Sequence, residues 1–349
     1  IGIGDRKSDG AALFDNYSRG VSTSRDAWCY NASGKAVTNN VTRMIEFYNA
    51  ELERFLSVFG ALPKLEMLER IDSFATIDQT KINWTQSLKE EMGKRKRLVF
   101  EPASLVPSLY RPFTKQRLYY NRRLNERVYQ MPSIFAEPSS QNLAILINAK
   151  YNGNGCLALI SNALPDLHCN GDSQCFPLYL YEEINADEAC EPQSHLFASA
   201  KTRTRRDAIT DNGLAHFQSA YPGETITKED LFYYVYGLLH SPDYRERYAD
   251  NLSKELPRIP RVKSAADFWS FSNAGRDLAD LHLNYETVPM YADAKIDSGG
   301  KTLTDADYRV EKMKYGKRGK DKDLTTLIYN AKITVTGIPL AAYDYVVNG

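Results

Sequence analysis

Apolar residues recur at spacings of three and four from Asn39 or Asn40 to a stop at Gly60. This period places them on one face of an α-helix, so the stretch predicts an amphipathic helix whose apolar face belongs to the core. The positions concerned are Val41, Met44, Ile45, Tyr48, Leu52, Phe55, Leu56 and Phe59.

Between about residues 98 and 180 the pattern changes to short runs rich in β-formers, separated by Pro, Gly and Asn. Such runs are typical of strands, and we expect a small mixed or antiparallel sheet. The runs are residues 98–100, 118–120, 143–147, 156–160 and 178–180.

The polar stretch 185–224 predicts a long loop or linker. After it, Thr227 can cap a helix, and Ser241 followed by Pro242 has the favoured order for opening a second one. A further helix is expected at 274–285, and the alternation at 327–338 predicts two strand segments.

Together these elements predict an α+β fold: a small mixed or antiparallel β-sheet subdomain with an N-terminal helix, then a mainly helical subdomain and a short C-terminal β element. The expected divisions are a junction at 1–38, the sheet-containing subdomain at 39–200, and the mainly helical subdomain with C-terminal strands at 201–349.

Composition agrees with a globular chain and excludes disordered and collagen-like classes, since 43% of the 349 residues are hydrophobic and 25% are charged. Mean hydropathy is −0.47, and no window approaches the roughly eighteen uncharged apolar residues of a membrane helix. We expect no membrane partner. Five irregularly spaced cysteines favour the reducing cytoplasm, and the absence of an initiator Met suggests a piece of a longer polypeptide.

Charge is segregated although the net charge is +0. Residues 94–127 contain ten basic and two acidic residues, and ten minus two leaves +8. Two more basic clusters lie at 201–206 and 309–322. Such clusters give a neutral protein a local positive face, which phosphate binding requires, although a single cluster is more often a solvated surface.

No segment of the sequence has the residue spacing that a catalytic, cofactor-binding or metal-binding motif requires. The triplet at 300–302 (GKT) resembles the end of a phosphate loop, but Lys295 stands where that loop needs glycine, so a turn is expected. The segment 241–244 (SPDY) lacks the second proline of a base-gripping methyltransferase motif, and helix capping explains it. A zinc site without a Cys-x-x-Cys pair is disfavoured; its imagined ligands are His168, Cys169, Cys175, Cys190 and His195.

Seven segments carry motifs that occur together in one order: 17–28 (YSRGVSTSRDAW), 110–120 (YRPFTKQRLYY), 176–181 (FPLYLY), 234–245 (YVYGLLHSPDYR), 256–260 (LPRIP), 274–282 (AGRDLADLH) and 337–340 (GIPL). As a set they resemble the C-terminal specificity region of type ISP enzymes, which are single-polypeptide restriction–modification enzymes. The resemblance covers residues 13–349.

The resemblance implies a large cytoplasmic bacterial protein with nuclease, helicase-like translocase, adenine-N6 methyltransferase and target-recognition domains. This chain resembles only the last of these, with residues 1–38 as the junction from the methyltransferase. S-adenosylmethionine, ATP and Mg²⁺ would bind to domains upstream, and no cofactor is expected in this chain. The implied partners are double-stranded DNA and the methyltransferase and helicase-like domains of the same polypeptide.

The implied function is to read a short DNA sequence and to position the duplex for adenine methylation, translocation and cleavage by the other domains. By the chemistry of phosphates we favour Lys94, Arg95, Lys96 and Arg97 for the DNA backbone. Base or groove contacts are expected from Arg122, Arg123, Asn125, Arg127 and Gln130, with pairing of Arg122 and Arg123 to surface acids as an equal alternative.

Two other groups are candidates for DNA binding. The basic cluster of Lys201, Arg203, Arg205 and Arg206 could follow the backbone or enter a groove from an irregular loop. Arg111, Lys115 and Arg117 lie in the shared segment 110–120. Because a shared scaffold residue cannot by itself encode a variable target, we interpret Arg111 and Arg117 as structural or phosphate-binding.

Two rival hypotheses remain. The chain could be a coupling module that holds the methyltransferase against the translocase with only incidental DNA contact, which the zero net charge favours. It could also be a free-standing enzyme of another class, which a deep pocket with perturbed acids would support.

Overall fold

The computed structural model describes residues 1–4, 12–137, 140–148, 156–183 and 203–346. The chain divides into two compact units, Ile1–Leu283 and Asn284–Gly349. Every α-helix of the described residues belongs to the first unit, and the second is built around one small sheet. This mixture confirms the expected α+β class.

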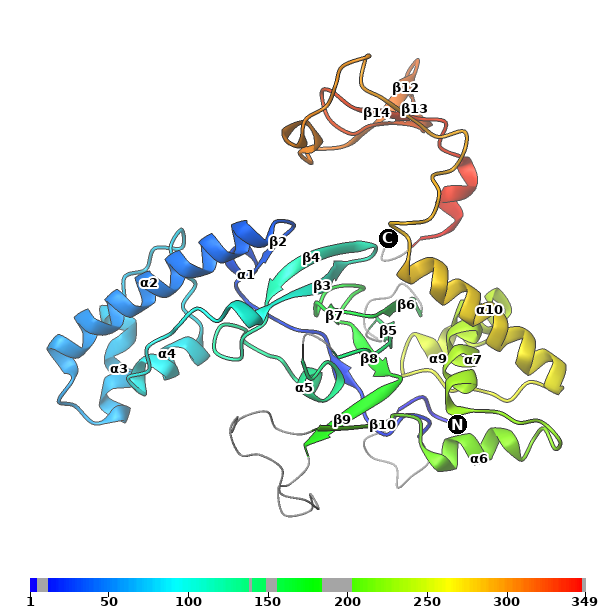
Figure 1. Ribbon diagram of the computed structural model, residues 1–349, viewed down its shortest axis with the longest axis horizontal. Coiled ribbons are helices and arrows are strands. Elements are labelled where there is room, and N and C mark those ends of the chain that lie inside the picture. Colours follow the sequence, from blue (N-terminus) through cyan, green and yellow to red (C-terminus); the bar gives the residue numbers. More distant parts are fainter. Residues whose placement is uncertain (5–11, 138–139, 149–155, 184–202, 347–349) are drawn as a thin grey trace, which may run out of the picture. The chain divides into compact units, whose positions relative to one another are not determined.

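A cluster of helices forms the N-terminal part of the first unit (Figure 1). Its helices are α1 (Asp26–Cys29), α2 (Gly34–Phe59), α3 (Lys64–Phe74) and α4 (Gln86–Gly93). The apolar stripe of α2 is buried as predicted, with Leu56 and Phe59 packed at its margin. The helix begins at Gly34 rather than Asn39 or Asn40 because the Ser33 hydroxyl accepts the Ala36 N–H at 3.3 Å and caps it there.

Two four-stranded sheets follow. One is mixed, because its last pair is parallel, and has the order β2 (Tyr30–Asn31), β4 (Thr114–Tyr119), β3 (Leu105–Arg111), β7 (Leu164–Pro165). The other is antiparallel, in the order β1 (Ser18–Arg19), β8 (Gln174–Pro177), β5 (Ala144–Ile147), β6 (Ala158–Ser161). The short helices η1 (Pro102–Ser104) and α5 (Met131–Ile134) lie between strands in the chain. Helix α2 packs on β4, whereas β6 contacts the later helices (Figure 1).

The later helices of this unit are α6 (Asp211–Gln218), α7 (Lys228–His240), α8 (Pro242–Arg247), α9 (Ala249–Leu252) and α10 (Ala265–Leu283). Thr227 caps α7 and Ser241 caps α8, as predicted. Helix α10 starts nine residues before the expected 274, because the Ser264 hydroxyl accepts the Asp267 N–H at 3.1 Å.

Helices α7 and α10 approach each other through two glycines. A Cβ added at Gly237 would lie 2.3 Å from the Phe271 carbonyl oxygen, and one at Gly275 would lie 2.0 Å from that of Tyr233. Backbone therefore packs directly on backbone at this crossing, where no larger residue fits.

The prediction of a long loop at 185–224 is wrong for residues 203–224, the part that the structure describes. Residues Arg203–Asp207 form strand β10, which pairs antiparallel with β9 (Tyr179–Glu183), and α6 follows. The signal was hidden because β10 is mostly exposed and charged, so it lacks the apolar alternation of a half-buried strand. Since this pairing joins strands on both sides of residue 200, the contacts divide the chain after Leu283 instead.

The second unit is an antiparallel sheet in the order β11 (Lys295–Asp297), β14 (Thr334–Thr336), β13 (Asp321–Ile328), β12 (Lys314–Arg318), with the one-turn helices η2 (Asp305–Tyr308) and η3 (Leu340–Asp344). Strands β13 and β14 confirm the predicted C-terminal β element. The GKT triplet lies in the expected turn, since Gly299 and Gly300 both have positive φ.

His240 at the end of α7 gives the fold a dependence on acidity. Its Nδ1 donates to the Tyr236 carbonyl oxygen at 2.9 Å, and burial lowers the pKa of His240 from 6.5 to about 4. Between these values the unfolded chain binds the proton and the folded chain does not, so stability falls as the pH drops from 6.5 toward 4.

We therefore expect His240 to lower the free energy of unfolding by about 2 kcal/mol between pH 7 and pH 5. Urea denaturation at the two pH values measures this change. His240→Asn, whose amide can keep the donor, should show a smaller loss, and an equal loss in both proteins would contradict the assignment.

Candidate nucleic-acid interface

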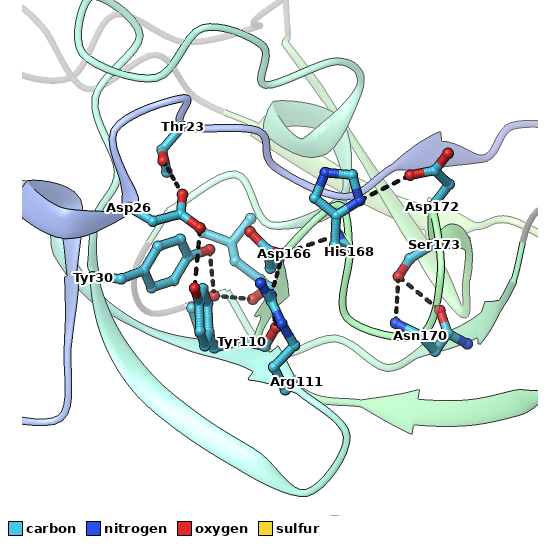
Figure 2. Close-up of polar contacts among 12 residues, drawn as sticks. Thr23, Asp26, Tyr30, Tyr110, Arg111, Asp166, His168, Asn170, Asp172 and Ser173 are labelled. Carbon is cyan, nitrogen blue, oxygen red and sulfur yellow. Dashed lines mark hydrogen bonds and ion pairs between the residues drawn. The ribbon is translucent and has the colours of Figure 1, made fainter. Parts of the chain in front are cut away.

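The segments 17–28 and 110–120 meet in one polar network (Figure 2). The Tyr110 hydroxyl donates to Asp26 Oδ2 at 3.1 Å, and the Thr23 hydroxyl donates to the other carboxylate oxygen. The hydroxyls of Tyr30 and Ser108 lie 3.1 Å apart in the same network. These side chains bind one another, so the network holds the start of the helical cluster against the mixed sheet.

Arg111 is also used inside the protein. Its guanidinium lies 2.6 Å from Asp166 Oδ1 and 3.9 Å above the Tyr110 ring, as Figure 2 shows for the ion pair. Burial raises the pKa of Asp166, while the His168 N–H and Arg111 oppose that rise. Of the two interpretations of Arg111, these contacts favour the structural one.

Arg25 is a buried cation that the sequence did not single out. It is only 1% exposed and donates to the carbonyl oxygens of Leu124 at 2.9 Å and Asn83 at 3.1 Å, and to the Thr85 hydroxyl. Burial lowers its pKa. Arg25 thus connects three separate parts of the chain.

The four residues favoured for phosphates are all exposed, but three have intramolecular partners. Lys94 pairs with Glu91 at 2.8 Å, which raises the pKa of Lys94, and Arg97 pairs with Glu53. Arg95, at φ +59°, donates to the carbonyl oxygens of Gly60 and Leu62 beyond α2. Lys96 is left without a side-chain partner among the described residues.

Arg122 and Arg123 differ in whether an acidic side chain pairs with them. Arg123 lies 3.6 Å from Glu91, the same carboxylate that Lys94 contacts, so here the predicted alternative of pairing with a surface acid holds. Arg122 is exposed, with no ion pair to any described residue. Its charge acts on the buried hydroxyl of Tyr120, whose pKa is raised by burial and lowered by Arg122.

Asn125 is reassigned from DNA to the fold. It is 1% exposed; its amide nitrogen donates to the Tyr119 carbonyl oxygen at 3.1 Å, and its Oδ1 accepts the Asn121 N–H at 2.9 Å. Both ends of the amide hold the turn after β4, so it presents neither end to a base.

Arg127 and Gln130 are exposed beside β1, which the sequence did not suggest. The Arg127 backbone forms a bridge with Ser22, and the Gln130 N–H donates to the Ser18 hydroxyl at 3.0 Å. A surface hollow of about 360 Å³ opens here, hereafter the β1 hollow, lined by Tyr17, Arg19, Tyr129, Gln130 and Gln174. Arg19 and Gln174 were not predicted as site residues from the sequence. Arg19 lies in the shared segment 17–28, which could have indicated it, whereas Gln174 lies in no shared segment.

The cluster at 203–206 is largely neutralised by acids. Arg203 pairs with Glu183 at 3.2 Å, and Arg206 pairs with Glu182 and with Asp15 at 2.6 Å. Arg205 stacks 4.2 Å above the Tyr179 ring. Lys201 lies outside the described residues.

The remaining predicted residues are on β4. Lys115 donates to the Leu283 carbonyl oxygen at 3.3 Å, at the end of α10. Arg117 is exposed and has no acidic partner in the described ranges. The exposed cations of this unit that the structure leaves without an acidic partner thus include Arg19, Lys96, Arg117, Arg122 and Arg127.

Metal and nucleophile chemistry has little support in the described part of the chain. There, no group of three or more His, Cys, Asp or Glu side chains could hold a metal ion. Burial raises the pKa of Cys169 to about 12 and that of Cys175 further, so these thiols stay protonated. Cys190 and His195 lie outside the described residues. The helices that the structure describes include none long and apolar enough to span a bilayer.

Three solved structures that resemble this chain contain DNA or a DNA substrate mimic, and two of them are Type ISP restriction–modification enzymes. LlaGI, a Type ISP enzyme solved as a nuclease-deletion mutant in complex with a DNA substrate mimic, is 36% identical with a TM-score of 0.77 over 98% of this chain. LlaBIII, an ATP-dependent Type ISP enzyme bound to DNA, is 34% identical with a TM-score of 0.80 over 100% of it. A DrdV–DNA complex is 30% identical with a TM-score of 0.78 over 98%.

This chain covers 28%, 20% and 31% of those three chains, respectively. No curated protein matches its sequence. The model of the Type ISP C-terminal specificity domain matches residues 12–349. The chain therefore belongs to the Type ISP C-terminal specificity domain family.

Proposed function

We propose that this chain recognises a short sequence in double-stranded DNA and positions the duplex for other domains of a restriction–modification polypeptide. The observation that carries the proposal is the likeness, over 98–100% of the chain, to three proteins solved with DNA or a DNA substrate mimic, two of which are Type ISP restriction–modification enzymes. The exposed cations without acidic partners support it, because phosphate contacts supply most of the affinity for a duplex.

The proposal assigns the chemistry elsewhere. Adenine-N6 methylation with S-adenosylmethionine, ATP-dependent translocation with Mg²⁺, and cleavage would belong to methyltransferase, helicase-like and nuclease domains of the longer polypeptide. This chain would then be non-catalytic and would act in the bacterial cytoplasm, where its DNA substrate lies.

Neutralised cations favour one alternative, a coupling module that holds those domains together. Lys94, Arg97 and Arg206 each have an acidic partner, so part of the basic surface is not available to phosphates. A module of this kind would bind duplex DNA weakly and without sequence preference.

Selection from a random duplex library at two salt concentrations separates the two functions. The 349-residue chain should retain duplexes that share one asymmetric sequence, more strongly at low salt. Retention without enrichment, or no retention, would overturn sequence recognition by this chain and favour the coupling module.

The unpaired cations should carry the salt dependence. If Arg122 and Arg127 contact phosphates, replacing both by Ala should weaken all duplexes alike and reduce the slope of log K against log salt by about 1 to 2, because each lost phosphate contact removes about 0.9. A changed sequence preference would instead support the base or groove contacts that the sequence predicts for them. Arg97→Ala is the matched control, since Glu53 already pairs with Arg97. Equal slopes in all three proteins would contradict this assignment.

A further inference from the structure

Strand pairing places two polar side chains next to each other in the β1 hollow. In the antiparallel pair of β1 and β8, Ser18 lies opposite Cys175 and Arg19 lies opposite Gln174. Because side chains alternate along a strand, the fully buried Ser18 and Cys175 face the core, and Arg19 and Gln174 point to the other side. The guanidinium and the amide are therefore neighbours on one outer face.

Gln130 comes to the same place from a different part of the chain. Its backbone N–H donates to the hydroxyl of Ser18, which also donates to the Arg19 carbonyl oxygen at 2.9 Å. The preceding Tyr129 has φ +45°, so the chain turns sharply before Gln130. One buried serine thus fixes both Arg19 and Gln130.

The walls of the hollow are held rigidly. The Tyr17 ring stacks on the buried Phe176 ring, with centroids 4.8 Å apart and an interplanar angle of 21°. Gln174 is in a strand whose next residues, Cys175 and Phe176, are fully buried. A rigid support of this kind keeps polar groups in place before a ligand arrives.

The polar ends of Arg19, Gln130 and Gln174 have no hydrogen-bond or ion-pair partner in the part of the chain that the structure describes, and all three line the hollow. A phosphate accepts hydrogen bonds and donates none, so it would use only the donor half of a glutamine amide. A glutamine amide offers a donor and an acceptor side by side, the pair that matches N7 and the N6 amino group of adenine in the major groove.

We propose that Gln130 and Gln174 read adenine edges in the major groove, and that Arg19 binds the neighbouring backbone phosphate. This inference rests on the proposed function. Arg19 receives the phosphate because it lies in the shared segment 17–28, as a scaffold contact should, whereas both glutamines lie outside the shared segments. The β1 hollow is then a base-reading site, and its ligand class is A·T pairs of duplex DNA.

The test repeats the random-duplex selection with Gln130→Ala, Gln174→Ala and Arg19→Ala, using Gln79→Ala on the exposed surface as the matched control. Each glutamine variant should lose about tenfold or more of the preference for adenine at one position and keep it elsewhere. Arg19→Ala should weaken all duplexes alike with the preference intact, and Gln79→Ala should behave as wild type.

Introducing a negative charge at position 174 gives a second readout, which is a change of the preferred base rather than a loss of preference. Gln174→Glu removes the donor and keeps the acceptors, so the preferred base at its position should change from adenine to cytosine, whose N4 amino group donates. Far-ultraviolet circular dichroism and the unfolding midpoint verify that each variant is folded.

The outcomes show separately whether base reading by the β1 hollow fails or the proposed function fails. Failure of the wild-type chain to enrich any sequence overturns the proposed function. If the wild-type chain enriches a sequence and all glutamine variants enrich the same one, base reading by the β1 hollow is overturned, and the proposed function stands. The same conclusion follows if the glutamine variants bind every duplex more weakly by the same factor.

Discussion

Gly275→Ala is expected to destabilise the chain by at least about 3 kcal/mol, because the new methyl group has no space at the crossing of α7 and α10. Its Cβ would lie 2.0 Å from the Tyr233 carbonyl oxygen and 2.7 Å from the Gly237 nitrogen. Both contacts are backbone, so no side chain can rotate away, and the two helices must separate. Chemical denaturation followed by circular dichroism measures the loss.

The matched control is Asn273→Ala on the exposed side of the same helix. It changes helix propensity without entering the crossing, and its stability should stay within about 0.5 kcal/mol of wild type. Equal stability of the two variants would mean that the helices do not approach as closely as described.

Arg25→Ala is expected to cost about 4 kcal/mol of stability. The substitution removes a buried guanidinium and leaves the carbonyl oxygens of Leu124 and Asn83 without their donor. These acceptors belong to the segment after β4 and to the one before α4, so their positions should loosen together. Hydrogen exchange of the amides in both segments, with denaturation of the whole chain, measures the effect.

Arg25→Lys should recover little of this loss, because one ammonium group cannot reach the acceptors that the planar fork spans. Arg70→Ala, at an exposed position of α3, controls for the loss of a positive charge. An Arg25→Lys protein as stable as wild type would show that the charge, rather than the geometry of its donors, is what the site needs.

Periodicity predicted the elements with strong local signals, and missed those that depend on partners. The stripe of α2 was visible, but its start was not, since a capping serine at position 33 is one of several polar residues there. Strand β10 was missed because its order comes from pairing with β9 rather than from its own apolar residues.

The candidate site shows the same limit at the level of side chains. The basic residues could be counted, but the acids that neutralise them could not be paired from sequence, since Glu53 is 44 positions from Arg97. Asn125 has the chemistry of a base reader, and only its burial shows that the fold uses both ends of its amide.

Arg19 and Gln174 illustrate contacts that no local pattern encodes. They are neighbours because β1 pairs with β8 across more than 150 intervening residues. Neither residue contributes to a periodic pattern of apolar positions, and Gln174 belongs to no shared motif. A sequence can supply the polar residues of such a hollow, while only the strand register determines which of them meet.

The lack of internal partners for Gln130 and Gln174 bears on how such a protein changes over generations. Arg25, Asp26 and Arg111 are bound into the fold, so their replacement costs stability. The two glutamines contribute little to folding through their polar ends, so many substitutions there are nearly neutral for it. If the β1 hollow reads bases as proposed, new target preferences can therefore arise by single substitutions in a lineage without first accumulating stabilising mutations.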